Sequence, residues 1–134
     1  VAARGRGRPP EHPFAAPQDA LTTYERTAAY ELPVPGPRFP TTRCSLVDLW
    51  PRTGRFHQIR RHLNYVAHPV IGDSSHGDSR QNRLFRDHLQ VSRLMLAAVE
   101  LAFTHPITES PVVIDCPLED SFQQVVDRLH AFSV

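Results

Sequence analysis

The sequence predicts an α+β fold, with a mostly antiparallel mixed sheet and flanking helices. Two early segments, 21–32 and 41–50, are rich in β-branched and aromatic residues, which favours strands. The last segment, 122–132, repeats apolar residues at the spacing of an amphipathic helix. Strands and helices follow one another without a regular βαβ alternation, so the pattern favours α+β over a parallel α/β arrangement.

The first two strands are expected to pair with each other. Segment 21–32 predicts a strand with a break near residues 28–29, and segment 41–50 alternates so that Cys44 and Leu46 lie on one face. The Pro- and Gly-containing loop between the two segments is short, which favours an antiparallel pair.

The middle of the chain alternates between helical and extended patterns. A helix is predicted over 56–67, and Pro69 ends it. A short helix is predicted over 82–89. The strongly apolar segment 94–104 predicts a buried strand, and 112–114 predicts a third buried strand that forms a hairpin with it.

Length and composition indicate one domain and exclude several classes of protein. The chain has 134 residues and 40% apolar residues, without a transmembrane run or a signal peptide, so a cytoplasmic protein is expected. Residues 1–18 are rich in Arg, Pro and Gly and predict a disordered or extended lead-in. Cys44 and Cys116 lack metal-ligand spacing and predict buried or half-buried thiols; no metal or cofactor is expected.

Charge is segregated along the chain although the formal net charge is only +1. Residues 50–93 carry eight Arg and three Asp, whereas residues 94–134 carry one Arg and six acids. All 15 basic residues are Arg, which a GC-rich genome also explains, but their clustering is separate evidence. One electropositive surface suited to phosphate groups is therefore expected.

The predicted helix at 56–67 has two distinct faces. Phe56, Ile59, Leu63 and Val66 form an apolar stripe, and a polar, cationic stripe lies beside it, made of His57, Arg60, Arg61 and Asn64. Such a helix can hold an anionic ligand at the edge of its packed face. An amphipathic surface helix whose charges face water is the alternative, and spacing alone does not separate the two.

The string Thr-Gly-Arg-x-His-Gln-Ile-Arg-x-His-Leu at 53–63 resembles the signature of RluA-type pseudouridine synthases. Further similar segments follow in order at 68–73, 76–78, 82–86, 93–96 and 103–106, and the middle ones are most similar to the tRNA pseudouridine synthase C branch. The resemblance covers roughly residues 19–131, and it implies that 19–134 is the C-terminal part of a pseudouridine synthase catalytic domain.

The resemblance implies a catalytic role for Arg60, which matches the family's Arg that forms an ion pair with a nucleophilic Asp. In the family, that Asp lies in a His-Arg-Leu-Asp string, and no such string occurs here. Asp48, Asp73 and Asp78 are not expected to replace it, and Asp73 matches a turn position. The chain alone is therefore predicted to be inactive, with RNA, in particular tRNA, as the implied partner of the complete enzyme.

The predicted RNA-binding residues are Arg52, Arg55, His57, Gln58, Arg61, Arg83 and Arg86. For His57 and Gln58, a capping and packing role at the start of the helix is an equal alternative. For Arg83 and Arg86, the equal alternative is that they are solvated surface residues. Two other hypotheses for the whole chain stay open at this point. One is a non-catalytic RNA-binding module from a truncated or split synthase, and the other is a chain that folds poorly alone because half of its sheet and core partners are absent. Self-association through an exposed sheet edge is a further open possibility.

Overall fold

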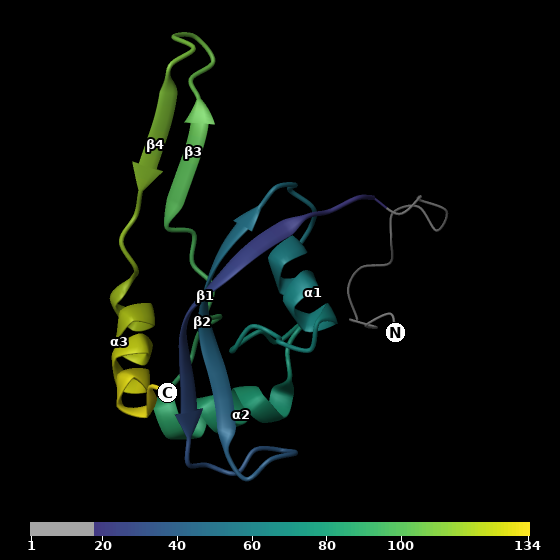
Figure 1. Ribbon diagram of the computed structural model, residues 1–134, viewed down its shortest axis with the longest axis vertical. Coiled ribbons are helices and arrows are strands. Elements are labelled where there is room, and N and C mark those ends of the chain that lie inside the picture. The colour runs from purple at the N-terminus through teal and green to yellow at the C-terminus, as the bar shows by residue number, and fades with distance from the viewer. Residues whose placement is uncertain (1–17) are drawn as a thin grey trace.

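The computed structural model describes residues 18–134, and these residues confirm the α+β class (Figure 1). Its elements are β1 Thr22–Leu32, β2 Thr42–Pro51, α1 Gln58–Tyr65, α2 Ser79–Leu89, β3 Glu100–Thr104, β4 Pro111–Asp115, α3 Asp120–Leu129 and the 3-10 turn η1 His130–Phe132. Apart from residue 18, the lead-in predicted for 1–18 lies outside the described residues.

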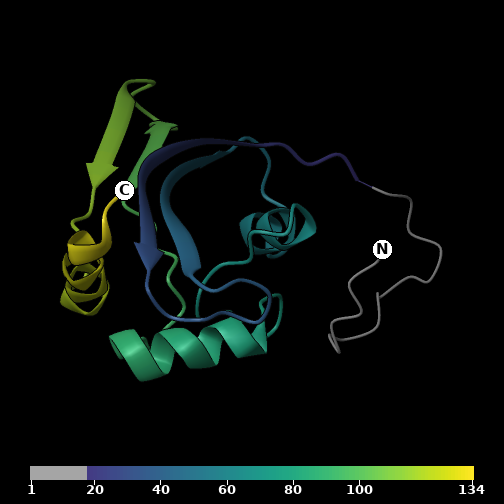
Figure 2. The same ribbon diagram turned by 60° about the horizontal axis from the view of Figure 1, so that its bottom comes forward.

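Strands β1 and β2 form the expected antiparallel hairpin, in which Thr22 faces Pro51 and Leu32 faces Thr42. The register shifts between Arg26 and Ala28, next to the predicted break. A bulge of this kind increases the local twist of a strand, and the hairpin indeed curves strongly (Figure 2). Helix α1 lies within this curve and contacts both strands (Figure 2).

The hydrophobic core joins the end of β1 to α2 and α3. Its buried members are Tyr30, Leu32, Phe85, Leu89, Val91, Val125 and Leu129. The predicted C-terminal amphipathic helix is confirmed, because α3 buries its apolar face against this cluster. A hydrogen bond of 2.8 Å from Arg128 Nη1 to the carbonyl oxygen of Leu89 ties α3 to the end of α2.

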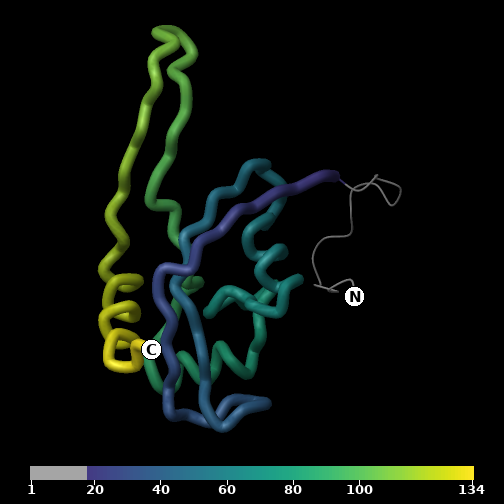
Figure 3. Tube along the Cα trace, in the orientation of Figure 1, coloured from purple at the N-terminus to yellow at the C-terminus, as the bar shows by residue number. Residues whose placement is uncertain are grey.

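The second hairpin, β3 with β4, projects from the rest of the chain (Figure 3). The antiparallel pairing was predicted correctly, but the predicted burial of both strands is wrong. Every residue of β3 is exposed, and the strand begins at Glu100 rather than at 94. The physical reason is that no third strand or helix in the described part of the chain covers either face. Residues 18–134 therefore contain two separate two-stranded sheets instead of one mixed sheet.

The helix boundaries follow from local backbone geometry. Helix α1 begins at Gln58 because His57 has the left-handed φ of 49°, and so it is shorter than the predicted 56–67. Helix α2 begins at Ser79, earlier than predicted, because the Asp78 carboxylate accepts hydrogen bonds from the first turn. None of the helices described here is long and apolar enough to cross a membrane.

The two cysteines differ in exposure. Cys44 is half-buried on β2, and burial raises the pKa of its thiol to about 11. Cys116 is exposed, so the prediction that both thiols are at least half-buried is wrong for it. The physical reason is the same as for β4, which it follows: nothing among the described residues packs over that segment. In residues 18–134 no group of His, Cys, Asp and Glu is arranged to hold a metal ion.

Candidate nucleic-acid and active site

Gln58 fastens the arginine-containing loop before α1 to the start of β1. Its side-chain oxygen accepts hydrogen bonds from Thr53 Oγ1 at 2.6 Å and from the Arg55 amide at 3.1 Å. Its side-chain nitrogen donates to the carbonyl oxygen of Leu21 at 2.9 Å and to Thr22 Oγ1 at 3.0 Å. Gln58 is only 6% exposed, and its side-chain oxygen and nitrogen are both hydrogen-bonded within the chain, although it also borders an open cavity. Of the two roles considered from the sequence, the geometry supports the packing role.

His57 lies at the turn that starts α1, and its ring is held on two sides. One face stacks on the Phe56 ring, with centroids 3.7 Å apart and planes at 24°. Its Nδ1 shares a hydrogen bond of 2.9 Å with His76 Nε2, so at least one of the two rings is neutral. Burial and the nearby Arg60 guanidinium lower the pKa of His57, which favours the neutral form.

Arg60 points from α1 onto the Gly72–Asp73 turn. Its Nε donates to Asp73 Oδ2 and its Nη2 donates to Asp73 Oδ1, both at 2.7 Å. The Arg60 side chain is 17% exposed and that of Asp73 is fully buried. This is the bidentate geometry in which an arginine and a carboxylate pair most strongly.

The pair corrects one sequence-based expectation. Arg60 was expected to await an acid from outside the chain, but the structure gives it a partner within the chain. The reason is that the tertiary fold packs the side of α1 against the turn that follows Pro69. The spacing of residues in the sequence did not reveal this contact. Asp73 was expected to serve the turn, and it does so as well, because its Oδ1 also accepts from the amides of Ser75 and His76.

The turn that carries Asp73 is fixed by glycine and asparagine. Gly72 has a φ of +83°, and a Cβ there would lie 1.9 Å from the carbonyl oxygen of Arg93. Asn82 on α2 accepts from the Gly72 amide at 2.8 Å and donates to the Asp73 carbonyl oxygen at 2.9 Å. Asn82 was not singled out as a site residue from the sequence, although it lies in a segment that carries the family resemblance.

An open cavity of about 360 Å³ lies beside Arg60. Its lining residues come from the end of β2 and the loop after it, the first turn of α1 and the segment after α2: Pro51, Thr53, Gly54, Arg55, His57, Gln58, Ile59, Arg60 and Leu96. Pockets of this size hold small organic molecules. Asp73 does not line the cavity, so its carboxylate lies behind Arg60 as seen from the cavity side.

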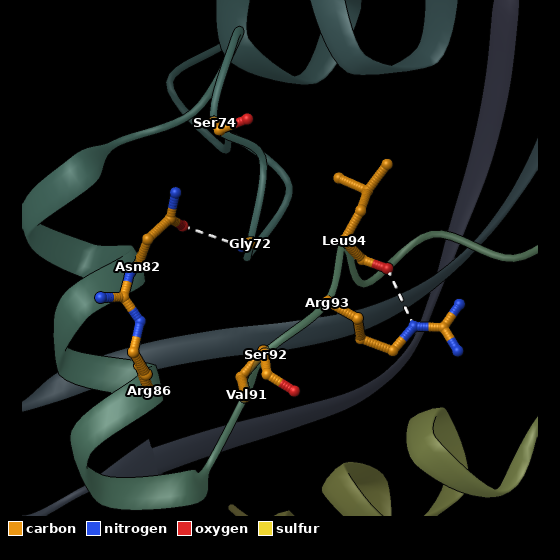
Figure 4. A pocket seen from close by; sticks show the side chains of 8 residues that line it. All are labelled: Gly72, Ser74, Asn82, Arg86, Val91, Ser92, Arg93 and Leu94. Atoms are coloured by element: carbon orange, nitrogen blue, oxygen red, sulfur yellow. Dashed lines mark hydrogen bonds between the residues drawn. The ribbon is translucent and has the colours of Figure 1, made fainter.

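The remaining predicted RNA-binding residues lie on the surface, in two places. Arg52 and Arg55 are exposed in the loop before α1, and Arg61 is exposed on α1. Arg83 and Arg86 are exposed on α2, and Arg86 lines a separate cavity of about 190 Å³ with Gly72, Ser74, Asn82, Val91, Ser92, Arg93 and Leu94 (Figure 4). The predicted residues therefore do not form one continuous cluster.

The Arg93 side chain is held by contacts with residues at the start of α3. It donates to Glu119 at 2.9 Å and to Ser121 at 2.7 Å, and its guanidinium lies 5.5 Å from the centre of the Phe122 ring. It therefore fastens the start of α3 to the segment after α2.

Comparison with known proteins identifies the family, although no family model matches the chain. Proteins named tRNA pseudouridine synthase C align with it over most of its length. That of Salmonella typhi is 51% identical over 113 residues, which is 84% of this chain and 44% of the relative. That of Vibrio cholerae serotype O1 is 48% identical over 83% of this chain and 46% of the relative. That of Haemophilus influenzae is 44% identical over 84% and 47%.

These alignments show that the chain belongs to the pseudouridine synthase family. Within that family, its sequence groups with the proteins named tRNA pseudouridine synthase C. The resemblance seen in the sequence is thereby confirmed. The chain spans less than half the length of these relatives.

Proposed function

We propose that this chain forms the arginine-bearing wall of the uridine pocket of an RNA pseudouridine synthase that acts on tRNA. The observation that carries the proposal is Arg60, which lines the cavity of about 360 Å³ while its Nε and Nη2 are held by buried Asp73. Within residues 18–134, Nη1 takes part in no such bond. The guanidinium edge that includes Nη1 is thus left for a ligand or a second carboxylate.

The isomerisation needs an acidic group that the described site does not offer. It breaks an N-glycosidic bond, turns the uracil and rejoins it through carbon, so a carboxylate must act at the sugar or the base. Asp73 is fully buried and accepts four hydrogen bonds, which excludes it as a nucleophile. Asp78 caps α2. We therefore propose that 19–134 is the C-terminal part of a pseudouridine synthase catalytic domain, and that the nucleophile comes from sequence outside this chain.

The first experiment measures pseudouridine formed on unmodified tRNA. We expect no product from the chain alone, and product from the chain joined to the segment that the Salmonella typhi relative carries beyond the match. In the joined protein, Arg60→Ala should lower kcat by at least about 100-fold, the size of effect seen when one charge-stabilising donor is removed. Arg43→Ala is the matched control, because that side chain is 78% exposed on β2.

Two results would contradict the proposal. Turnover by the chain alone would show that an acid within it is sufficient. Equal activity of the Arg60→Ala and Arg43→Ala proteins would show that Arg60 only holds the turn at 72–73.

A non-catalytic RNA-binding module is the second candidate, and the exposure of Arg52 and Arg55 before α1 and of Arg61 on it favours this candidate. Both candidates predict RNA affinity that falls steeply with salt, because phosphate contacts release counterions. Only the synthase predicts that the joined protein gains turnover. Salt-dependent binding without any gain of turnover would therefore favour the module.

A further inference from the structure

Phe56 presents a flat aromatic face at the edge of the candidate site. It is 74% exposed, although it was expected to belong to the buried stripe of the first helix. A single exposed Phe is common on protein surfaces and needs no explanation by itself. This ring differs because one of its faces is stacked on His57, with centroids 3.7 Å apart. Its opposite face is therefore the one available to a ligand.

The stacked pair is anchored rather than loosely placed. His57 adopts a φ of 49°, a left-handed backbone conformation that residues other than Gly adopt uncommonly. Its ring is hydrogen-bonded to His76, whose amide donates to Asp73 Oδ1 at 2.8 Å. The same buried carboxylate thus orients both Arg60 and, through His76, the aromatic pair.

The surroundings of Phe56 indicate the chemical class of its ligand. Arg55 precedes it and Arg52 lies in the same loop, both exposed, and His57 is shared between the stack and the cavity beside Arg60. Exposed aromatic rings among arginines are typical of sites for single-stranded nucleic acid, where bases stack and phosphates pair with the cations.

We propose that Phe56 stacks on an unpaired RNA base, the neighbour of the uridine that enters the cavity beside Arg60. This inference rests on the proposed function as an RNA enzyme. An enzyme that extracts a nucleotide from its stack must stabilise the neighbours left behind. Phe56 stacks on His57, which lines the cavity, but does not line the cavity itself, so its exposed ring is placed to receive one of them.

The experiment compares two RNAs of equal length, a hairpin with an unpaired uridine-containing loop and a fully paired duplex. Fluorescence anisotropy of labelled RNA measures Kd for the full 134-residue chain over a series of salt concentrations. Phe56→Leu keeps an apolar side chain but removes the flat ring, whereas Phe56→Tyr keeps the ring. We expect Phe56→Leu to weaken loop binding by about 5- to 150-fold, the range known for one stacked base, and Phe56→Tyr to bind as the wild type does.

The duplex and the salt series test the mechanism. Duplex affinity and the salt dependence should be unchanged in Phe56→Leu, since no charge is lost. Arg55→Ala should instead weaken both RNAs and reduce the salt slope by about 1. A Phe56→Trp variant in a Trp50→Phe background should show fluorescence quenching with the loop RNA and none with the duplex.

The outcomes separate failure of this inference from failure of the proposed function. If the wild-type chain binds neither RNA, the proposed RNA function is wrong. If it binds with the expected salt dependence but Phe56→Leu is unchanged on loop RNA, the stacking inference is overturned. Equal weakening on both RNAs would also overturn it, because that result indicates a structural role for the ring.

Discussion

Replacing Asp73 by Asn tests whether the buried ion pair with Arg60 holds the site together. The variant keeps the shape of the side chain but removes its charge and turns one acceptor into a donor that faces the guanidinium. Removing one partner of a buried pair costs about 3–5 kcal/mol, and the lower value is expected because Arg60 is 17% exposed. With a urea dependence of about 2 kcal/mol per molar, the unfolding midpoint should fall by about 1.5 M.

The pH dependence gives the prediction a second, independent check. Hydrogen bonds from Arg60, aided by the amides of His76 and Ser75, hold the pKa of Asp73 well below 3.8 against the opposing effect of burial. Because the pKa is lower in the folded state, the pair stabilises the fold fully above the ordinary carboxyl pKa. That stabilisation is lost as the pH falls below about 4. The difference between wild type and Asp73→Asn should therefore be constant from pH 5 to 8 and shrink in more acidic buffer.

The matched control is Asp78→Asn, an identical chemical change at a helix N-cap. Asn caps helices about as well as Asp, so its midpoint should move by no more than about 0.3 M, equivalent to a few tenths of a kcal/mol. Equal midpoints for wild type and Asp73→Asn at pH 7 would refute the argument. A stability difference as large at pH 3 as at pH 7 would also refute it, since the carboxylate charge would then not be its source.

Three further substitutions test the packing around the site by urea unfolding followed by circular dichroism. Gln58→Leu should lower the free energy of unfolding by about 2 kcal/mol, because it removes the hydrogen bonds that buried Gln58 makes to its part-buried partners; an unchanged midpoint would show that Gln58 does not fasten the loop. Gly72→Ala should cost more than about 1 kcal/mol, since φ is positive and the methyl group meets a backbone carbonyl; Gly54→Ala, with open space around it, is its control. Phe85→Ala should cost about 3–5 kcal/mol in the core, whereas Phe103→Ala on the projecting hairpin should cost far less; similar losses would mean that the hairpin is covered.

The elements that were predicted correctly are those whose formation depends on residue patterns within a few positions along the chain. The C-terminal helix, the first hairpin and its irregularity near 28 all follow from periodicity and turn residues within a few positions. Burial of β3 and β4 was mispredicted because apolar composition shows that a strand can be buried, not what covers it. Leu101 and Phe103 pair with Ile114 and Val112 on one face of that hairpin, and no described element packs there.

For the site, the sequence identified the residues better than their partners. The string at 53–63 singled out His57, Gln58 and Arg60, which the structure brings together at the first turn of α1. The pairing of Arg60 with Asp73 was missed because it depends on how α1 meets a turn after Pro69, a tertiary contact without a periodic signal. Burial of Gln58 was equally hidden, since its hydrogen-bond partners come from the distant start of β1.

The buried Asp73 changes what Arg60 can do for a second carboxylate. A lone guanidinium would strongly favour the ionised form of an approaching acid, but here its charge is already balanced by a carboxylate behind it. Arg60 should therefore orient a nucleophile through its remaining N–H groups more than it lowers the pKa of that nucleophile. In the joined protein, Arg60→Lys should then lose nearly as much kcat as Arg60→Ala, because an ammonium keeps the charge but lacks a planar group that can bind two carboxylates at once. If Arg60→Lys instead kept most of the wild-type kcat, the site would require only the positive charge of residue 60.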